Sequence, residues 1–281
     1  MFSEVELKTK LKQFASDKGM LPSPGEMEAL IQAMLAYIGA VDSELRDDLI
    51  YSTLAGWIMR GEVLSSEQCR GIFDIVQDEK HLLLGLGEKD TDTVFTRTFS
   101  ALQIPPLLIR HRQTPYLDSS QVMRAKENLL RYILEENDRR GYVEGKGWAH
   151  GIAHSADALD DLVQCSELSI DDLREILAAL IPVIAYNEFT YGFGEDERLV
   201  TPVIAILRRG LIPMSEMKDW LAVLVSRVTD QVSINRRVVA RANVKNFLQS
   251  LFFRTKWATK SPELQQAIDD LLNEMNPYKG C

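Results

Sequence analysis

The chain has 281 residues, a net charge of −9 and a hydrophobic content of 46%, the composition of a globular protein large enough to bury a sizeable core. This acidic balance argues against a general nucleic-acid binder, because such proteins usually present a basic surface. No apolar run reaches the length of about 18 residues that a membrane-spanning helix needs. The charged N-terminal segment also lacks the apolar stretch of a signal peptide. We therefore expect a cytoplasmic protein with no membrane partner.

The first predicted helices carry recognisable start and stop signals. Residues 26–39 place apolar side chains on one face at helical spacing, and Pro24 stands where a helix begins. The next helical segment ends at Gly61, a residue type that commonly stops helices. A new helix starts with Ser65, and Gln68 follows at the spacing of a capping pair. The rest of the chain is similar, so we predict an all-α protein of about a dozen helices.

The predicted helices come in pairs, and the second helices of five pairs resemble one another. They begin near Asp47, Asp92, Trp148, Asp196 and Asn235, so that the starts lie 45, 56, 48 and 39 residues apart. This spacing is near the period of about 40–47 residues of HEAT-type helical pairs. We predict a single all-helical domain over residues 1–281, with five to six helix pairs folded as a HEAT-like helical-repeat solenoid. An irregular α/α toroid or bundle is the alternative.

Two of the four histidines lie in GWAHGIAHSADALDDL, residues 147–162. If a helix starts at the beginning of this segment, one stripe about 60° wide holds His150, His154, Asp157 and Asp161. Apolar side chains occupy the opposite side. In a solenoid the second helices line a concave groove, so we expect this stripe to face the groove.

The histidine stripe also permits a metal site. Two histidines four residues apart can reach one ion, as in HExxH sites, and Asp157 could be a third ligand or orient an imidazole. The ion would be Zn or another divalent metal. The segment departs from HExxH because Gly151 stands in place of the glutamate, so Glu195 or Asp196 of the next repeat would have to complete the site. A solvated polar face is the structural alternative.

A second polar cluster lies in NEFTYGFGEDERL, residues 187–199. Asp196 is the predicted N-cap of the following helix, and acids at a helix start suit its dipole. Glu195 and Asp196 therefore also have a structural explanation. Arg198 could reach a carboxylate of the neighbouring repeat.

Basic clusters are candidate sites for a carboxylate or phosphate. Arg97 lies in DTVFTRTFSAL, and other basic residues cluster in the loop-like stretch LIRHRQTP and at Arg236, Arg237 and Arg241. Salt bridges between repeats are the alternative.

Three segments together resemble a known bacterial family. DTVFTRTFSAL, VEGKGWAHGIAHSADALDDL and FGEDERL occur in this order, and the second segment is the most specific. Over roughly residues 30 to 260 the chain resembles the family catalogued as domain of unknown function 2785. The resemblance implies one helical-repeat domain from a bacterial cytoplasm. It implies no reaction, ligand or catalytic residue.

The sequence favours binding over catalysis. It contains no P-loop and no nucleophile elbow, and no complete catalytic set can be named. Its three cysteines show no CxxC spacing and predict neither a disulfide framework nor a cysteine zinc site. We expect a cofactor-free monomer or homodimer that binds a peptide, a protein segment or a small anionic ligand in a polar concave groove. The expected groove residues are Arg97, Trp148, His150, His154, Asp157, Glu195, Asp196, Arg198 and Arg237. The alternative is a metal-dependent or His/Asp acid–base hydrolase that uses the same residues, with His150, His154 and Asp157 as metal ligands.

Overall fold

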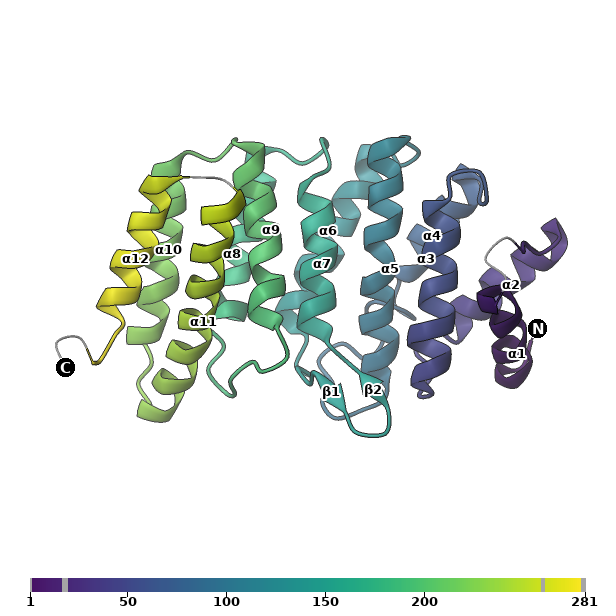
Figure 1. Ribbon diagram of the computed structural model, residues 1–281, viewed down its shortest axis with the longest axis horizontal. Coiled ribbons are helices and arrows are strands. Elements are labelled where there is room, and N and C mark those ends of the chain that lie inside the picture. Colours follow the sequence, from purple (N-terminus) through teal and green to yellow (C-terminus); the bar gives the residue numbers. More distant parts are fainter. Residues whose placement is uncertain (1, 17–19, 259–260, 279–281) are drawn as a thin grey trace. The chain divides into compact units, whose positions relative to one another are not determined.

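The computed structural model describes residues 2–16, 20–258 and 261–278, and its regular structure is almost entirely helical (Figure 1). The all-α prediction is confirmed. The helices are α1 (Glu4–Ser16), α2 (Pro24–Ala36), the π-helix η1 (Glu44–Tyr51), α3 (Ser52–Met59), α4 (Ser66–Val76), α5 (Thr93–Gln113), α6 (Ser119–Glu135), α7 (Gly151–Val163), α8 (Ile170–Ile184), α9 (Glu195–Arg209), α10 (Met214–Thr229), α11 (Ile234–Ala258) and α12 (Pro262–Glu274). One short antiparallel hairpin pairs β1 (Tyr142–Val143) with β2 (Gly147–Trp148).

The chain divides into two compact units, and the boundary falls within α7. Unit 1 extends to Ala158, and unit 2 begins at Leu159. The expectation of a single domain stays a prediction.

The predicted helix starts near the N-terminus are confirmed. Pro24 is the first residue of α2, where its missing N–H costs nothing. At α4 the backbone N–H of Gln68 donates to the Ser65 hydroxyl at 3.1 Å, and the Ser65 N–H donates to the Gln68 side chain at 2.9 Å. This reciprocal pair satisfies two backbone donors that the helix itself leaves unpaired.

In unit 1 we group η1–α3, α5 and α7 as second helices and α2, α4 and α6 as the first helices that precede them. The first helices α4 and α6 run parallel: the Gln121 amide donates to Asp74 at 3.3 Å, and Asn128 donates to the Gln77 carbonyl at 3.2 Å. The second helices α3 and α5 also pack together. Each pair thus buries its apolar side against the next pair.

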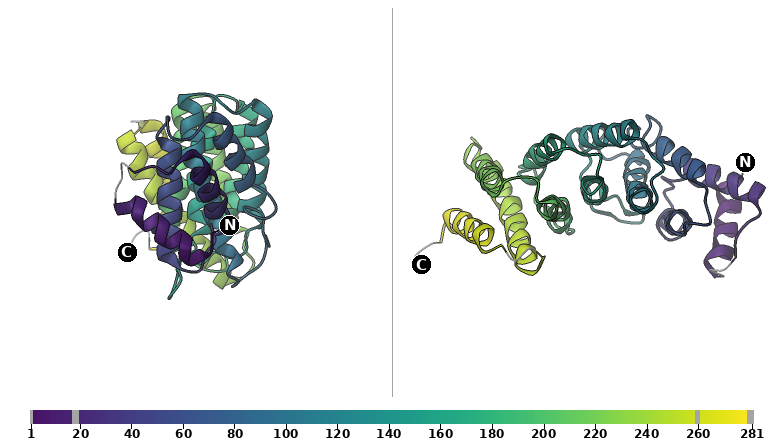
Figure 2. Two further views of the ribbon diagram at one scale, coloured as in Figure 1. Left: turned by 90° about the vertical axis from the view of Figure 1, so that its right-hand side faces the viewer. Right: turned by 90° about the horizontal axis from the view of Figure 1, so that it is seen from above.

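Unit 2 repeats this arrangement with α8 and α10 as first helices and α9 and α11 as second helices (Figure 2). Arg174 of α8 holds Glu216 of α10 at 2.8 Å, and Trp220 donates its indole N–H to the Leu177 carbonyl at 2.7 Å. The residue numbers rise together along both helices, so α8 and α10 are parallel.

An arginine at the C-terminal end of a second helix clamps the preceding loop in both units. In unit 1, Arg110 of α5 donates at 2.6–3.2 Å to three carbonyls at the end of α3 and in the following loop: Ile58, Gly61 and Leu64. In unit 2, Arg209 of α9 donates at 2.9–3.2 Å to the carbonyls of Val163, Cys165 and Leu168. A charged donor here satisfies helix-terminal carbonyls that lack intrahelical partners.

The basic stretch LIRHRQTP is therefore a structural element and not the predicted loop. Its first six residues are the end of α5. The buried ring of His111 accepts at Nδ1 from the backbone N–H groups of Tyr116 and Leu117 at 3.1 and 3.2 Å. Arg110 therefore stabilises the loop after α3, and His111 stabilises the turn after α5.

Candidate functional site

The hairpin before α7 exposes two aromatic rings. Tyr142 and Trp148 face each other across the two strands, with ring centroids 5.2 Å apart in an edge-on arrangement. Their side chains are 46% and 38% exposed. The His150 ring stacks on Trp148 at 4.5 Å with an interplanar angle of 18°. The chain thus presents a contiguous aromatic surface, which we call the hairpin stack (Tyr142, Trp148 and His150).

A buried arginine fixes the hairpin to the N-terminal half of unit 1. Arg46 of η1 donates to the carbonyls of Lys146 and Trp148 at 2.7 and 3.4 Å. Its guanidinium lies 4.2 Å from the centre of the Phe95 ring, where cation–π attraction adds to the hydrogen bonds. The close packing at Gly147, which has a φ of +82°, leaves no room for a side chain: a Cβ there would lie 2.7 Å from Ser43.

The same arginine forms an ion pair with its neighbour Asp47 at 2.8 Å. Burial lowers the pKa of Arg46 and raises the pKa of Asp47 to about 6, since a low-dielectric surrounding disfavours both charged forms. The carboxyl below the hairpin therefore titrates above the usual range for an aspartate.

The helix after the hairpin starts later than predicted. It begins at Gly151, and His150 lies before it with a φ of +56°, in the left-handed region. The backbone N–H of His154 donates to the His150 carbonyl at 2.9 Å. The predicted polar stripe was wrong in two respects: His150 is outside the helix, and His154 and Asp161 are buried. Trp148 belongs to the hairpin.

His154 is directed into unit 1. Its Nδ1 lies 3.3 Å from the Thr98 carbonyl, which can only accept, so Nδ1 carries the proton in this contact. Its ring meets Phe99 edge-on at 5.3 Å and His150 at 5.7 Å. The structure therefore brings the two histidines together, but one is in the core and the other is in the hairpin stack. Asp157 is half-buried on α7.

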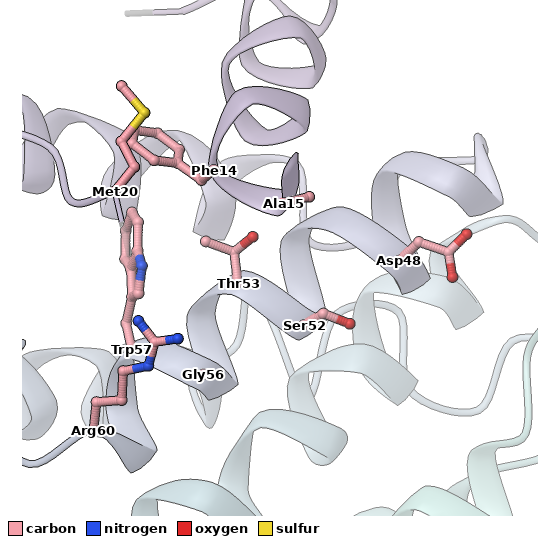
Figure 3. Close-up of a pocket in the computed structure, with 9 residues that line it drawn as sticks. All are labelled: Phe14, Ala15, Met20, Asp48, Ser52, Thr53, Gly56, Trp57 and Arg60. Carbon is pink, nitrogen blue, oxygen red and sulfur yellow. The ribbon is translucent and has the colours of Figure 1, made fainter. Parts of the chain in front are cut away.

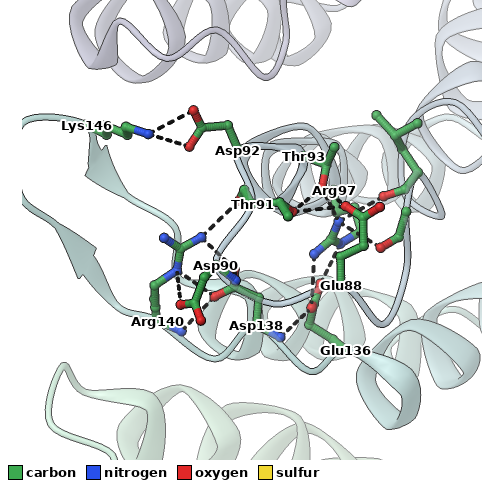
Figure 4. Close-up of polar contacts among 12 residues, drawn as sticks. Glu88, Asp90, Thr91, Asp92, Thr93, Arg97, Glu136, Asp138, Arg140 and Lys146 are labelled. Carbon is green, nitrogen blue, oxygen red and sulfur yellow. Dashed lines mark hydrogen bonds and ion pairs between the residues drawn. The ribbon is translucent and has the colours of Figure 1, made fainter.

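Arg97 has all three guanidinium nitrogens bonded inside the fold (Figure 4). Nε and Nη2 donate to the two carboxylate oxygens of Glu136 at 2.7 and 3.1 Å. Nη1 donates to the Leu84 carbonyl and to the Thr93 hydroxyl, both at 2.9 Å. Arg97 and Glu136 are fully buried. A buried arginine whose donors are satisfied in this way is a structural clamp between two loops.

Further charged residues extend this clamp toward the hairpin. Arg140 donates to Asp138 at 2.8 Å and to the Thr91 carbonyl at 2.9 Å, and Lys146 binds Asp92 at 2.6 Å (Figure 4). The loops before α5 and before α7 are thereby joined. Sequence reasoning did not identify this role of residues 136–140, because no pattern links them to residues 88–97.

The fully buried Tyr132 of α6 lies beneath the start of α7. A Cβ at Gly151 would be 2.9 Å from its hydroxyl oxygen, so glycine is required there for close packing. Burial raises the pKa of Tyr132 well above its ordinary value, which keeps this hydroxyl neutral.

Three of the predicted groove residues of unit 2 lie on α9, and the fourth, Arg237, lies on α11. Glu195 is the buried first residue of α9, and it accepts the Phe193 N–H at 2.8 Å. The predicted cap, Asp196, was wrong: the N-cap position is Gly194, and Asp196 accepts from the Ser250 hydroxyl at 3.1 Å.

The two predicted cations of unit 2 are both exposed. Arg198 lies on the first turn of α9. Arg237 lies on the first turn of α11 and donates to the Gln231 carbonyl at 2.8 Å. The predicted groove combines residues of both units, and its existence stays a prediction.

In the described residues, the predicted metal ligands are not part of any cluster of three metal-binding side chains. Over residues 2–16, 20–258 and 261–278, no group of three or more His, Cys, Asp and Glu side chains is placed to hold a metal ion. His154 directs Nδ1 at a carbonyl, and the His150 ring is stacked on Trp148.

A cavity that sequence reasoning did not identify lies between α1 and η1–α3 (Figure 3). Its volume is about 360 Å³, and its lining includes Phe14, Trp57 and the small residues Ser52 and Gly56. Phe14 and Trp57 meet edge-on at 5.8 Å. A side chain at Gly56 would meet nothing within 4 Å, so this glycine leaves the cavity open.

The comparisons with known proteins point to one family. Within the described residues, no helix is both long and apolar enough to cross a membrane. No curated protein and no solved structure matches the chain. The model of the family described as "Protein of unknown function (DUF2785)" matches residues 82–253, a segment that includes the hairpin stack and the Arg97 clamp. The chain belongs to this family.

Proposed function

We propose that this protein is a HEAT-like helical-repeat protein that binds a peptide or protein segment through the hairpin stack. It requires no cofactor in this role. The observation that carries the proposal is the exposure of Tyr142 and Trp148 on a hairpin that buried charges hold in place. Rigid aromatic rings offer a large contact area and lose little conformational entropy on binding, which is why they dominate protein recognition surfaces.

The repeat arrangement supports the first half of the proposal. Successive first helices are parallel in unit 1 and again in unit 2. The arginine clamps at Arg110 and Arg209 close equivalent loops. Recurrence of one supersecondary unit with its neighbour contacts is typical of helical-repeat proteins.

The contacts of Arg97 favour a peptide over a small anionic ligand. Anion recognition by arginine needs free donors directed at the ligand, and the donors of Arg97 are directed at Glu136 and at loop carbonyls. The hydrolase alternative gains no support from the histidines either, because His154 is buried against Thr98 and Phe99.

Selection from a displayed random-peptide library against the full chain tests the proposal. We expect selected peptides to bind with micromolar affinity, and we expect Trp148→Ala to weaken them about tenfold or more, as for a central aromatic anchor. Tyr278→Ala is the matched control, because Tyr278 is an exposed aromatic residue of unit 2. Peptides that bind the Trp148→Ala protein as tightly as the wild type would refute the proposal, and so would a failure to select any peptide.

A further inference from the structure

Helix α11 is the basic element of an acidic protein. Between Gln231 and Ala258 the chain has six Lys or Arg residues and no Asp or Glu. A charge of +6 here, in a chain of −9, leaves −15 for the remainder. The six basic residues are Arg236, Arg237, Arg241, Lys245, Arg254 and Lys256.

These cations have no acidic partners in the part of the chain that the structure describes. No ion pair joins any of the six to an Asp or Glu there, although ion pairs occur on other helices of unit 2, such as Arg174 with Glu216 and Lys218 with Glu263. Arg237 donates to a backbone carbonyl, and Arg254 donates to a carbonyl and a hydroxyl. Helix α12 packs against α11 and carries four acids of its own, yet none of them neutralises this set.

Apolar side chains are exposed beside the cations. Ile234 is 75% exposed and Val238 is 48% exposed at the start of α11, and Phe253 and Trp257 are 50% and 71% exposed near its end. The adjacent Val232 is almost completely exposed. Single exposed apolar residues are ordinary, but several on one helix indicate an interaction surface.

Three of the six cations and the exposed apolar side chains share one face. At about 100° per residue, an arc of about 160° contains Ile234, Val238, Arg241, Lys245, Phe253, Lys256 and Trp257. The helix has 25 residues, so this face extends for about 37 Å. The opposite side packs within unit 2 through buried residues such as Val244 and Phe247. We call the exposed side the basic face of α11.

We infer that the basic face of α11 binds the surface of an anionic lipid bilayer. Exposed Lys and Arg side chains are each stabilised by about 1 kcal/mol near an anionic bilayer surface, and exposed Trp side chains favour the headgroup region. The cations attract lipid phosphate and carboxylate groups, and the apolar side chains enter the boundary with the acyl chains. A helix that lies on a bilayer needs no spanning length, so the lack of a spanning helix among the described residues does not oppose this role.

Charge complementarity makes the partner anionic, and the aliphatic side chains favour lipid over nucleic acid. Bases are recognised by stacking on aromatic or guanidinium planes and by hydrogen bonds, to which Ile234 and Val238 contribute nothing. A straight line of exposed side chains also suits a planar surface, because it needs no complementary groove.

Vesicle sedimentation with the full chain tests the inference. The probes are phosphatidylcholine vesicles with and without 30% phosphatidylserine, in 0.1 M and 0.5 M salt. We expect binding that requires phosphatidylserine and weakens at high salt, because screening shortens the reach of surface charges. The double variant Arg241→Gln/Lys245→Gln should bind about 30-fold more weakly, from about 1 kcal/mol per basic residue.

Substitution of the exposed apolar side chains distinguishes binding to lipid from binding to other polyanions. The double variant Ile234→Ser/Val238→Ser should bind phosphatidylserine vesicles about tenfold more weakly. The control Lys80→Gln/Arg208→Gln, at two exposed basic residues outside α11, should bind as the wild type. All substituted side chains are exposed or half-exposed, and unchanged thermal unfolding will verify the folds.

Three outcomes would overturn the inference. The first is no binding to phosphatidylserine vesicles. The second is unchanged vesicle binding by the Ile234→Ser/Val238→Ser protein. The third is binding of a short DNA duplex or of polyglutamate as tight as vesicle binding, with dependence on the cations alone. Brominated acyl chains give an independent readout. Trp257 is 71% exposed, so binding should quench the tryptophan fluorescence of the wild type more than that of Trp257→Phe.

Discussion

Two loops present aromatic residues just before a second helix, and they are held in different ways. The loop before α7 is held by buried charges, with Arg46 bonded to the hairpin backbone and Arg97 paired with Glu136. The loop before α9 is held by a neutral amide. Asn243 of α11 donates to the carbonyls of Tyr186 and Phe189 at 2.8 and 3.0 Å and accepts the Tyr191 N–H at 2.9 Å.

The type of contact that holds each loop determines how strongly the loop responds to substitution and to pH. A buried ion pair is costly to desolvate and costly to break, and it responds to pH when its carboxyl is poorly solvated. An amide that satisfies three backbone groups has no charge to titrate, and its loss leaves only neutral groups unpaired. We therefore expect the unit 1 loop to be the more sensitive of the two.

The largest expected effect is the loss of the Glu136 carboxylate. Glu136→Ala leaves the buried guanidinium of Arg97 without its counter-charge, so we expect the free energy of unfolding to fall by about 3–5 kcal/mol. Urea denaturation followed by circular dichroism measures this. The control is Glu135→Ala, whose exposed carboxylate pairs with Arg131 and should contribute below about 1 kcal/mol. Equal losses in the two variants would contradict the assignment of Arg97 as a structural clamp.

Asp47 should make unit 1 sensitive to pH. Its pKa is raised to about 6 from an ordinary value of 3.8, so the folded protein holds a proton that the unfolded chain has released. The contribution of this group to stability is therefore present at low pH and is lost as the pH rises from about 4 to about 6. We expect a loss of about 1–3 kcal/mol.

The measurement is the difference in unfolding free energy between the wild type and Asp47→Asn at several pH values, because other carboxylates also titrate. As the pH rises from about 4 to about 6, the wild type should lose stability relative to Asp47→Asn. Asp219→Asn, at an exposed aspartate of unit 2, should give a flat difference. A flat difference for Asp47→Asn as well would show that its carboxyl is solvated.

The Asn243 amide should contribute less to the free energy of unfolding than the ion pair of Arg97 with Glu136. Asn243→Ala leaves two carbonyls and one N–H around residues 186–191 without partners, and we expect a loss of about 2–3 kcal/mol in unfolding free energy. Asn235→Ala, at an exposed position of the same helix, is the control and should change little. If Asn243→Ala costs more than Glu136→Ala, the ranking of the two clamps is reversed.

The smallest expected effect is a difference between two glycines with the same backbone conformation. Gly147 and Gly194 both have a φ of +82°, but a Cβ at Gly147 would meet Ser43 at 2.7 Å and one at Gly194 would meet nothing within 4 Å. Gly194→Ala should cost about 1 kcal/mol from backbone strain alone. Gly147→Ala should cost about 1–2 kcal/mol more because of overpacking. Thermal unfolding of both variants measures these costs. Equal costs would mean that the hairpin moves to accommodate the added methyl group at residue 147.

Much of the helical framework could be predicted, because it follows from local patterns. Apolar spacing and capping pairs identify α2 and α4, and the similar segments near Asp47, Asp92 and Asp196 lie at or close to the starts of second helices. The family was also identifiable from its most specific segment. These signals act over a few residues, and the sequence displays them directly.

The hairpin and the roles of the histidines could not be predicted in the same way. The glycines of EGKG permit a tight turn, and Gly145 and Gly147 do adopt positive φ values, so a turn signal was present at the beginning of the segment assigned to a helix. Whether His154 faces solvent or Thr98 depends on where α7 begins, and a shift of a few residues rotates every side chain. The burial of Arg97 depends on Glu136, 39 positions away, which no local pattern reveals.

The long-range hydrogen bonds of Arg46 affect how the protein would unfold under mechanical force. In unit 2, the bonds of Arg209 and Asn243 join positions 41 to 57 apart along the chain, so tension applied there would release one helix pair at a time. Arg46 reaches across 100 positions to Lys146 and 102 to Trp148. Helical repeats that contact only their neighbours unfold one after another. A hydrogen bond that connects residues on either side of a whole helix pair instead makes the helices between them unfold together. A single-molecule stretching trace should therefore show small regular steps from unit 2 and one large rupture from unit 1.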